Sequence, residues 1–236
     1  VERGAIEPTM RKALRTAAAD RPGAVHLSVG ADVLKADAQG AAVRLPADSV
    51  TPTEAAAGTA AVVRAPGTTT SPLDVIRAAK RPVILAGISA VRANATPALT
   101  RLAEVIGAPV IVGGMAKGVI SEEHPYFGGV IEMASGTVIW DMLRGADVVI
   151  TAGFDAIELS KSWTLSAKVI HVDSFANTDQ IIPSDHEVIG HIPSILNWFA
   201  EEFKGNPRWS EADVAAHRKA LRDEYYSGRV SHAMNP

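Results

Sequence analysis

The chain has 236 residues, 47% of them apolar, which is enough to bury a core in one large domain or in a medium domain with extensions. Its 26 acidic and 23 basic residues nearly balance, which argues against a nucleic acid or a membrane surface as partner, because either would need a basic patch. No cysteine is present, which excludes disulfides and thiolate metal sites and fits a cytoplasmic location.

The first 71 residues predict a short folded segment followed by a linker. Residues 9–19 are rich in Ala, Leu, Arg and Lys, which favour a helix, and residues 24–28 predict a short strand. Residues 35–71 are rich in Ala, Thr, Pro and Gly and poor in large apolar side chains, which predicts a linker between domains. Because the chain opens at Val1 without a methionine and stops at Pro236, we expect a piece of a longer protein.

The middle of the chain alternates apolar runs with amphipathic segments. Four β-branched runs are apolar almost throughout, and they span residues 83–86, 110–112, 148–150 and 169–172. Such runs are typical of strands that are covered on both faces of a parallel sheet. Residues 97–106 and 137–143 carry apolar side chains at helical spacing. The alternation predicts an α/β fold, an open parallel sheet flanked by helices in a Rossmann-like topology.

The last quarter of the chain predicts a final strand and two helices. Residues 187–190 predict an edge strand, and residues 192–203 read as an amphipathic helix. Residues 210–226 predict a second helix with Ser210 as N-cap and Asp213 at the third position, close to a capping box. No uninterrupted apolar run reaches about 18 residues, so no membrane-spanning helix is expected.

Each main strand is followed at once by glycine or aspartate. The residues concerned are Gly87 after the first strand, Gly113-Gly114 after the second, Gly153-Phe154-Asp155 after the third and Asp173-Ser174 after the fourth. In open parallel sheets, ligands bind beyond the carboxyl ends of the strands, where glycine lets the backbone approach a phosphate and an acid can accept from ribose hydroxyls. The pattern indicates a nucleotide-shaped cleft. The alternative is that these are ordinary turns, because most α/β domains use glycine there whatever they bind.

Sharper motifs are missing or incomplete. No strand is followed by GxGxxG, neither GxSxG nor HExxH occurs, and residues 113–118 have the glycine spacing of a P-loop without its Lys and Ser or Thr. His186 and His191 lack a defined third ligand, which favours a solvated loop over a metal site. His26 and His171 fall in predicted strands, which favours satisfied core histidines.

Short sequence blocks follow one another in a characteristic order between residues 75 and 200. They lie at residues 81–87, 102–104, 107–110, 117–120, 123–125, 127–129, 146–150, 153–155 and 169–173. The ordered set resembles the central domain of thiamine-diphosphate-dependent enzymes of the acetolactate synthase type, with residues 117–129 similar to a loop of that family. Residues 21–28 with Asp32-Val33 resemble the end of the pyrimidine-binding domain that precedes it.

The resemblance implies a division of the chain into four parts. These are the end of the pyrimidine-binding domain at 1–34, a linker at 35–71, the central domain at 72–204, and a helix and linker towards a cofactor-binding domain at 205–236. The glutamate that activates thiamine diphosphate would lie upstream of Val1, and the Gly-Asp-Gly motif that holds Mg²⁺ would lie downstream of Pro236. The parent, a homodimer or homotetramer, would decarboxylate a 2-keto acid and pass the carbanion to an acceptor, whereas this chain alone would bind no thiamine diphosphate.

In the family that this chain resembles, the central domain holds FAD, ADP or nothing. The resemblance places such a ligand against Gly87, Ser89, Gly113, Gly114, Met115, Gly153, Phe154, Asp155, Asp173 and Ser174. The Arg that acetolactate synthases carry between the glycine and phenylalanine is missing here, which weighs against FAD. Three hypotheses stay open: the central part of such an enzyme, a free-standing module that binds NAD, ADP or FAD, and a scaffold whose vestigial cleft serves subunit packing.

Overall fold

The computed structural model describes residues 6–17, 23–35, 61–64, 70–132, 136–159, 162–177 and 180–227. The chain divides into two compact units, Val1–Ala56 and Ala57–Pro236. In the first unit, α1 (Ile6–Ala17) confirms the predicted helix, and α2 (Ala31–Lys35) follows. The strand predicted at 24–28 is wrong, because residues 23–30 pair with no strand and His26 is exposed. A lone strand gains no ladder of hydrogen bonds, and none of the described residues of this unit offers it a partner strand.

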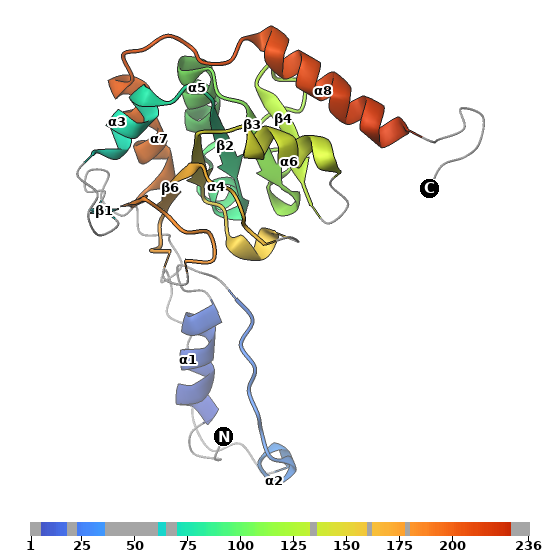
Figure 1. The fold of residues 1–236 in the computed structure, drawn as a ribbon. Coiled ribbons are helices and arrows are strands. Elements are labelled where there is room, and N and C mark those ends of the chain that lie inside the picture. The colour runs from blue at the N-terminus through green and yellow to red at the C-terminus, as the bar shows by residue number, and fades with distance from the viewer. Residues whose placement is uncertain are drawn as a thin grey trace. The chain divides into compact units, whose positions relative to one another are not determined.

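A sheet forms the centre of the second unit (Figure 1). Within the described residues its strand order is β1-β7-β6-β5-β2-β3-β4. The strands are β1 (Ala61–Arg64), β2 (Pro82–Ala86), β3 (Val110–Gly113), β4 (Phe127–Ile131), β5 (Val148–Ala152), β6 (Lys168–Asp173) and β7 (His186–Ile189). The strands from β7 to β4 run parallel, and β1 pairs antiparallel with β7. The predicted α/β fold with an open parallel sheet is confirmed.

Burial of apolar strand residues stabilises the sheet. Every residue of β2 and β5 is buried, and Ile84 and Ile150 stand in register on neighbouring strands. Each fully buried side chain of this size contributes about 1.5–3 kcal/mol. Because the strands are covered on both faces, they contain no alternating polar residues, and this is why their composition predicted them.

Helices cover both faces of the sheet. The α-helices of this unit are α3 (Pro72–Ala78), α4 (Ile88–Arg92), α5 (Thr96–Ile106), α6 (Thr137–Arg144), α7 (Ile192–Glu202) and α8 (Glu211–Tyr226). Helix α5 packs along α7, and α6 packs against α8 and β4. The chain runs from β2 through α5 to β3, and it returns from β4 through α6 to β5, in the opposite direction across the sheet. Right-handed connections therefore place α5 and α6 on opposite faces.

The two end strands of the sheet were not predicted. Residues 127–129 were expected in a loop, but they open β4, where a register shift at Val110/Ile111 makes Gly128 the extra residue of a bulge. Two adjacent glycines concealed this strand, because glycine weakens any strand pattern. Residues 61–64 form β1 within the range 35–71 expected as a linker, of which 36–60 and 65–69 lie outside the described residues. Since β1 covers β7, the prediction that β7 is an edge strand is wrong.

Helix α8 is capped at its start and is fixed to α6 at its end. At its start the predicted capping box is confirmed, because Asp213 N donates to Ser210 Oγ at 3.1 Å and Ser210 N donates to Asp213 Oδ2 at 3.0 Å. At its end Glu224 Oε1 accepts hydrogen bonds from the backbone N and the Oγ1 of Thr137, each at 2.7 Å. The helix thus lies within the second compact unit, and the predicted end of the central domain at residue 204 stays a prediction. None of the described helices is long and apolar enough to cross a membrane.

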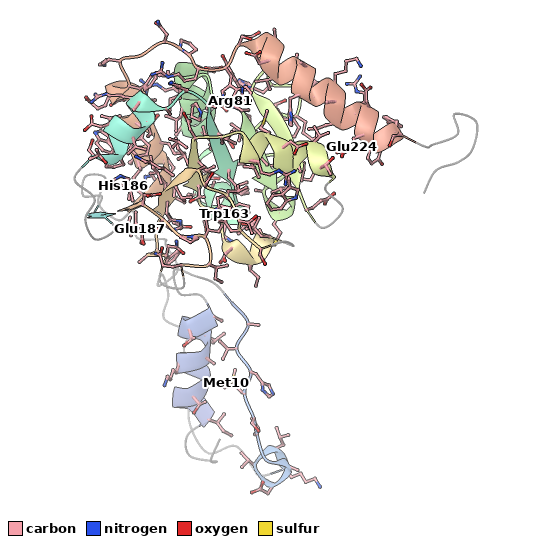
Figure 2. All side chains as sticks on the ribbon, in the orientation of Figure 1. Met10, Arg81, Trp163, His186, Glu187 and Glu224 are labelled. Atoms are coloured by element: carbon pink, nitrogen blue, oxygen red, sulfur yellow. The ribbon has the colours of Figure 1, made fainter. Side chains whose placement is uncertain are left out.

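The Glu224 carboxylate caps the first turn of α6, and Figure 2 labels it on α8 beside that helix. Hydrogen bonds from Thr137 are the main cause that lowers the pKa of Glu224 from its ordinary value of 4.5. Its contribution to stability is therefore present above 4.5 and is lost as the pH falls through the lower pKa of the folded state. We expect Glu224→Gln to lower the free energy of unfolding at neutral pH, and the difference from wild type to shrink in acid.

Urea unfolding at neutral and acidic pH measures this difference. Asp223→Asn is the matched control, because it removes an acid one residue away whose carboxylate meets only Lys219, at 2.6 Å, among the contacts seen for it. Equal losses for the two variants at neutral pH would show that the cap on α6 contributes nothing specific.

Candidate functional site

The predicted strand ends meet at one edge of the sheet. Strands β6, β5, β2 and β3 are consecutive parallel neighbours, so Gly87, Gly113, Gly153 and Asp173 lie along the same carboxyl-end rim. The chain leaves β2 towards β3 and returns to β5 on the other side of β2. The boundary between β2 and β5 is therefore a topological switch point, the position where open α/β sheets bind ligands. That these residues hold a cofactor stays a prediction.

The backbone at the switch point is closely packed. Gly153 has φ +60°, and a Cβ there would come within 2.9 Å of the Ser89 carbonyl carbon and would also collide with Ala90 N. Gly87 N donates to Ala152 O at 3.0 Å, Ser89 N donates to Gly153 O at 3.0 Å, and Gly153 N donates to Val172 O at 2.7 Å. These N–H groups, which could have faced a phosphate, are thus used to join β2, α4, β5 and β6.

A carboxylate from the next turn occupies the crevice. Glu158 ends the 3-10 helix η3 (Ala156–Glu158), which follows β5. Its Oε1 accepts from Ile88 N at 3.1 Å and from Asp155 N at 3.3 Å, so it links the first residue of α4 to the start of η3. Its Oε2 is buried and accepts no hydrogen bond from the described part of the chain.

Gly113 at the end of β3 makes room for this carboxylate, and Gly87 at the end of β2 makes room for it and for the backbone of Gly153 and Phe154. A Cβ on Gly87 would lie 2.5 Å from Glu158 Oε1, and a Cβ on Gly113 would overlap Glu158 Oε2 and lie 3.1 Å from its Cδ. Neither glycine has a positive φ, since the values are −123° and −64°. Glycine is therefore required at both positions because there is no room for a Cβ atom, and not because the backbone is left-handed.

The electrostatic setting of Glu158 is unfavourable for a second anion. Burial is the main cause that raises the pKa of Glu158, and the charge of Asp155 raises it further. Hydrogen bonds from Ile88 and Asp155 and the charge of Arg92 act in the other direction. Acid–base chemistry by Glu158 would require a substrate beside it, and its carboxylate is instead turned onto backbone N–H groups of its own chain.

Some of the other predicted site residues lie near the Glu158 carboxylate, and others lie away from it. Phe154 is buried, and a Cβ on Gly113 would lie 3.2 Å from its Cε2 atom. Asp155 caps η3, with Ile157 N donating to its Oδ1 at 3.1 Å. The buried Asp173 accepts from Ser174 N at 2.6 Å. Two further predicted site residues, Gly114 and Met115, are both exposed.

Sequence reasoning missed Glu158, although a signal for it was present. Asp155 and Glu158 have the spacing of a capping box directly after a predicted strand, and both reciprocal hydrogen bonds of that motif are formed. The spacing predicts a contact between Glu158 and Asp155 N. It cannot predict the contact with Ile88 N, because that residue is 70 positions away.

The histidines give a mixed result. His171 is a core residue as predicted, with Nδ1 at 3.2 Å from Thr151 Oγ1 and Nε2 at 3.2 Å from Phe175 O. His186 is buried in β7, so its prediction as a loop residue is wrong, whereas His191 is exposed with Nδ1 at 2.9 Å from Ser194 Oγ. Among the described residues, no three side chains of His, Asp or Glu gather closely enough to hold a metal ion.

Comparison with known proteins gives a consistent family. The family described as "Thiamine pyrophosphate enzyme, central domain" matches residues 70–198. The chain is 31% identical to an acetolactate synthase of Bacillus subtilis over 201 residues, which cover 81% of this chain and 33% of that protein. It is 26% identical to human 2-hydroxyacyl-CoA lyase 1 over 234 residues, which cover 96% of this chain and 38% of that protein. The chain thus spans about a third of the length of these relatives.

A solved structure supports the fold independently. The X-ray structure of a putative thiamin diphosphate-dependent enzyme from Mycobacterium smegmatis aligns with 88% of this chain and 38% of its own, with a TM-score of 0.58. The two sequences are 18% identical over this alignment, so the likeness concerns the fold alone.

Proposed function

Because the chain belongs to the thiamine pyrophosphate enzyme family, through the central domain of that family, we propose that it is the structural centre of a thiamine-diphosphate- and Mg²⁺-dependent enzyme. The observation that carries the proposal is that the family match covers the parallel part of the sheet. The family match at residues 70–198 contains β2 to β7, so it covers six of the strands in the described sheet. The similar acetolactate synthase supports decarboxylation of a 2-keto acid, with transfer of the carbanion to an acceptor, as the reaction of the whole protein. The similar 2-hydroxyacyl-CoA lyase supports cleavage of a 2-hydroxyacyl-CoA as the alternative.

The residues of this chain do not fit the cofactor of that reaction. Thiamine diphosphate, when bound, supplies the centre that stabilises the carbanion. The sequence contains no Gly-Asp-Gly, and the described residues contain no group of metal-binding side chains. We therefore assign this chain a structural role, which is to hold the domains that bind the cofactor within a homodimer or homotetramer. FAD or ADP is not needed for such a role.

The complete reading frame that encodes this chain tests the proposal. We expect it to encode a glutamate upstream of residue 1 and a Gly-Asp-Gly motif followed by Asn downstream of residue 236. Its product should decarboxylate pyruvate or cleave a 2-hydroxyacyl-CoA only when thiamine diphosphate and Mg²⁺ are supplied. The chain of residues 1–236 serves as the control and should show no turnover. A reading frame without either motif, or turnover that is independent of thiamine diphosphate, would refute the proposal.

A further inference from the structure

The switch point between β2 and β5 has an occupant that comes from the chain itself. We propose that the Glu158 carboxylate fills the place where the diphosphate of a dinucleotide would lie, and thereby closes the crevice to FAD and ADP. The inference deepens the proposed structural role. It is independent of thiamine chemistry, because it is carried by contacts among β2, β3, β5, α4 and η3.

The first argument concerns space. A diphosphate that binds along this rim would need room beyond the carboxyl ends of β2 and its neighbours, beside the glycines that follow these strands. Beside Gly113 that room is taken by Glu158, whose Cδ would lie 3.1 Å from a Cβ there. Beside Gly87 it is shared by Glu158 Oε1 and the backbone Gly153 O, each 2.5 Å from a Cβ. The ring of Phe154 borders the same space from beside Gly113. A ligand would have to displace Glu158 before it could approach either strand end.

The second argument concerns hydrogen-bond donors. A bound phosphate is held by backbone N–H groups that have no other acceptor. Here Ile88 N and Asp155 N donate to Glu158 Oε1, and the N–H groups of Gly87, Ser89 and Gly153 donate to carbonyl oxygens of the chain. These five backbone N–H groups at the strand ends therefore already have acceptors within the chain and are not available to a diphosphate.

The third argument concerns the charges around Glu158. A diphosphate would meet the carboxylates of Glu158 and Asp155, with Arg92 as the cation that acts on Glu158.

A capping box alone explains only the contact between Glu158 and Asp155 N. It does not explain why Glu158 also reaches Ile88 N on another element, or why its buried Oε2 extends towards Gly113. These two features are what an internal substitute for a bound anion requires.

Calorimetric titration with ADP and with FAD tests the closure. We expect wild-type chain to give no saturable binding of either compound, and Glu158→Ala to bind ADP at least about tenfold more tightly, a gain of about 1.4 kcal/mol. Glu123→Ala is the control, because it removes an exposed acid located before β4 and should behave as wild type. Saturable binding of ADP or FAD to wild type would overturn the proposal. Equal affinities of wild type and Glu158→Ala, including no binding by both, would also overturn it.

A double-mutant cycle tests the same contact without any ligand. Gly113→Ala should lower the folding equilibrium constant, because its Cβ would overlap the Glu158 carboxylate. In the Glu158→Ala background this penalty should shrink at least about tenfold, since the two nearest obstructing atoms belong to a side chain that is then gone and only Phe154 Cε2, at 3.2 Å, remains. Gly114→Ala is the matched control, because its Cβ would meet nothing closer than Glu132 atoms at 3.8 Å, and its effect should be equal in both backgrounds.

An unchanged penalty for Gly113→Ala would show that Glu158 does not fill this space in solution. Both experiments use the chain of residues 1–236 and neither uses thiamine diphosphate. A failure here would therefore leave the proposed activity of the complete enzyme intact, and a failure of that activity would leave the closed crevice intact.

Discussion

Replacing Trp209 by alanine is expected to lower the free energy of unfolding of the second unit by about 3–5 kcal/mol. The side chain is only 7% exposed, and its Nε1 donates to Pro82 O, at the start of β2, over 2.9 Å. Its backbone N donates to Gly107 O at 2.9 Å. Arg81, labelled in Figure 2, places its guanidinium carbon 4.1 Å from the centre of the indole ring. One residue thus connects the segment before α8 to two other elements.

The effect is large because several losses coincide. Truncation opens a cavity under the start of α8, leaves Pro82 O without its indole donor, and removes the stacking partner of Arg81. Trp209→Phe keeps most of the apolar volume and loses the hydrogen bond, so it should cost about 1–2 kcal/mol. A buried aromatic ring therefore contributes most of the total, and its polar end contributes the rest.

Urea unfolding followed by circular dichroism measures both variants. Trp198→Ala is the matched control, because this tryptophan on α7 is 38% exposed and its truncation removes far less buried surface. A loss for Trp209→Ala no larger than that for Trp198→Ala would show that α8 is not anchored through Trp209.

The accuracy of the sequence predictions depends on how local each structural cause is. The buried parallel strands were found because covering both faces leaves an almost continuous apolar run, as in β5. Such a run can be recognised within about five consecutive residues. Strand β4 was missed because its pairing depends on a bulge opposite Ile111, and its glycines carry no strand pattern. Strand β1 was missed because its partner, β7, is more than a hundred residues away.

The same distinction holds at the candidate site. The rim of glycines could be predicted, because each glycine follows its own strand and parallel topology brings these strand ends together. What occupies the rim could not be predicted. A glycine that makes room for a ligand cannot be told, from the sequence, from a glycine that makes room for a side chain. The contact of Glu158 with Ile88 N, across 70 residues, and its approach to Gly113 distinguish the two cases.

Gly153 provides the second large effect. We expect Gly153→Ala to lower the free energy of unfolding by about 2–4 kcal/mol, the sum of a left-handed backbone and an overpacked contact. Its φ is +60°, and the added Cβ would meet Ala90 N, the Ser89 carbonyl carbon at 2.9 Å and Ser89 Cβ at 3.0 Å. The first two are backbone atoms of α4, which side-chain rotation cannot move. Relief would require α4 to shift, and α4 is held to the turn after β5 by the hydrogen bond from Ser89 N to Gly153 O.

Gly118→Ala separates the two contributions to this loss. Gly118 also has a positive φ, of +89°, but a Cβ there would meet nothing within 4 Å, so only the backbone strain of about 1–2 kcal/mol applies. The excess loss in Gly153→Ala over Gly118→Ala therefore measures the contact with α4. If the two variants unfold at the same urea concentration, the switch point is looser than its geometry indicates. The same looseness would let Glu158 leave the crevice, so this stability measurement also bears on whether a nucleotide could enter.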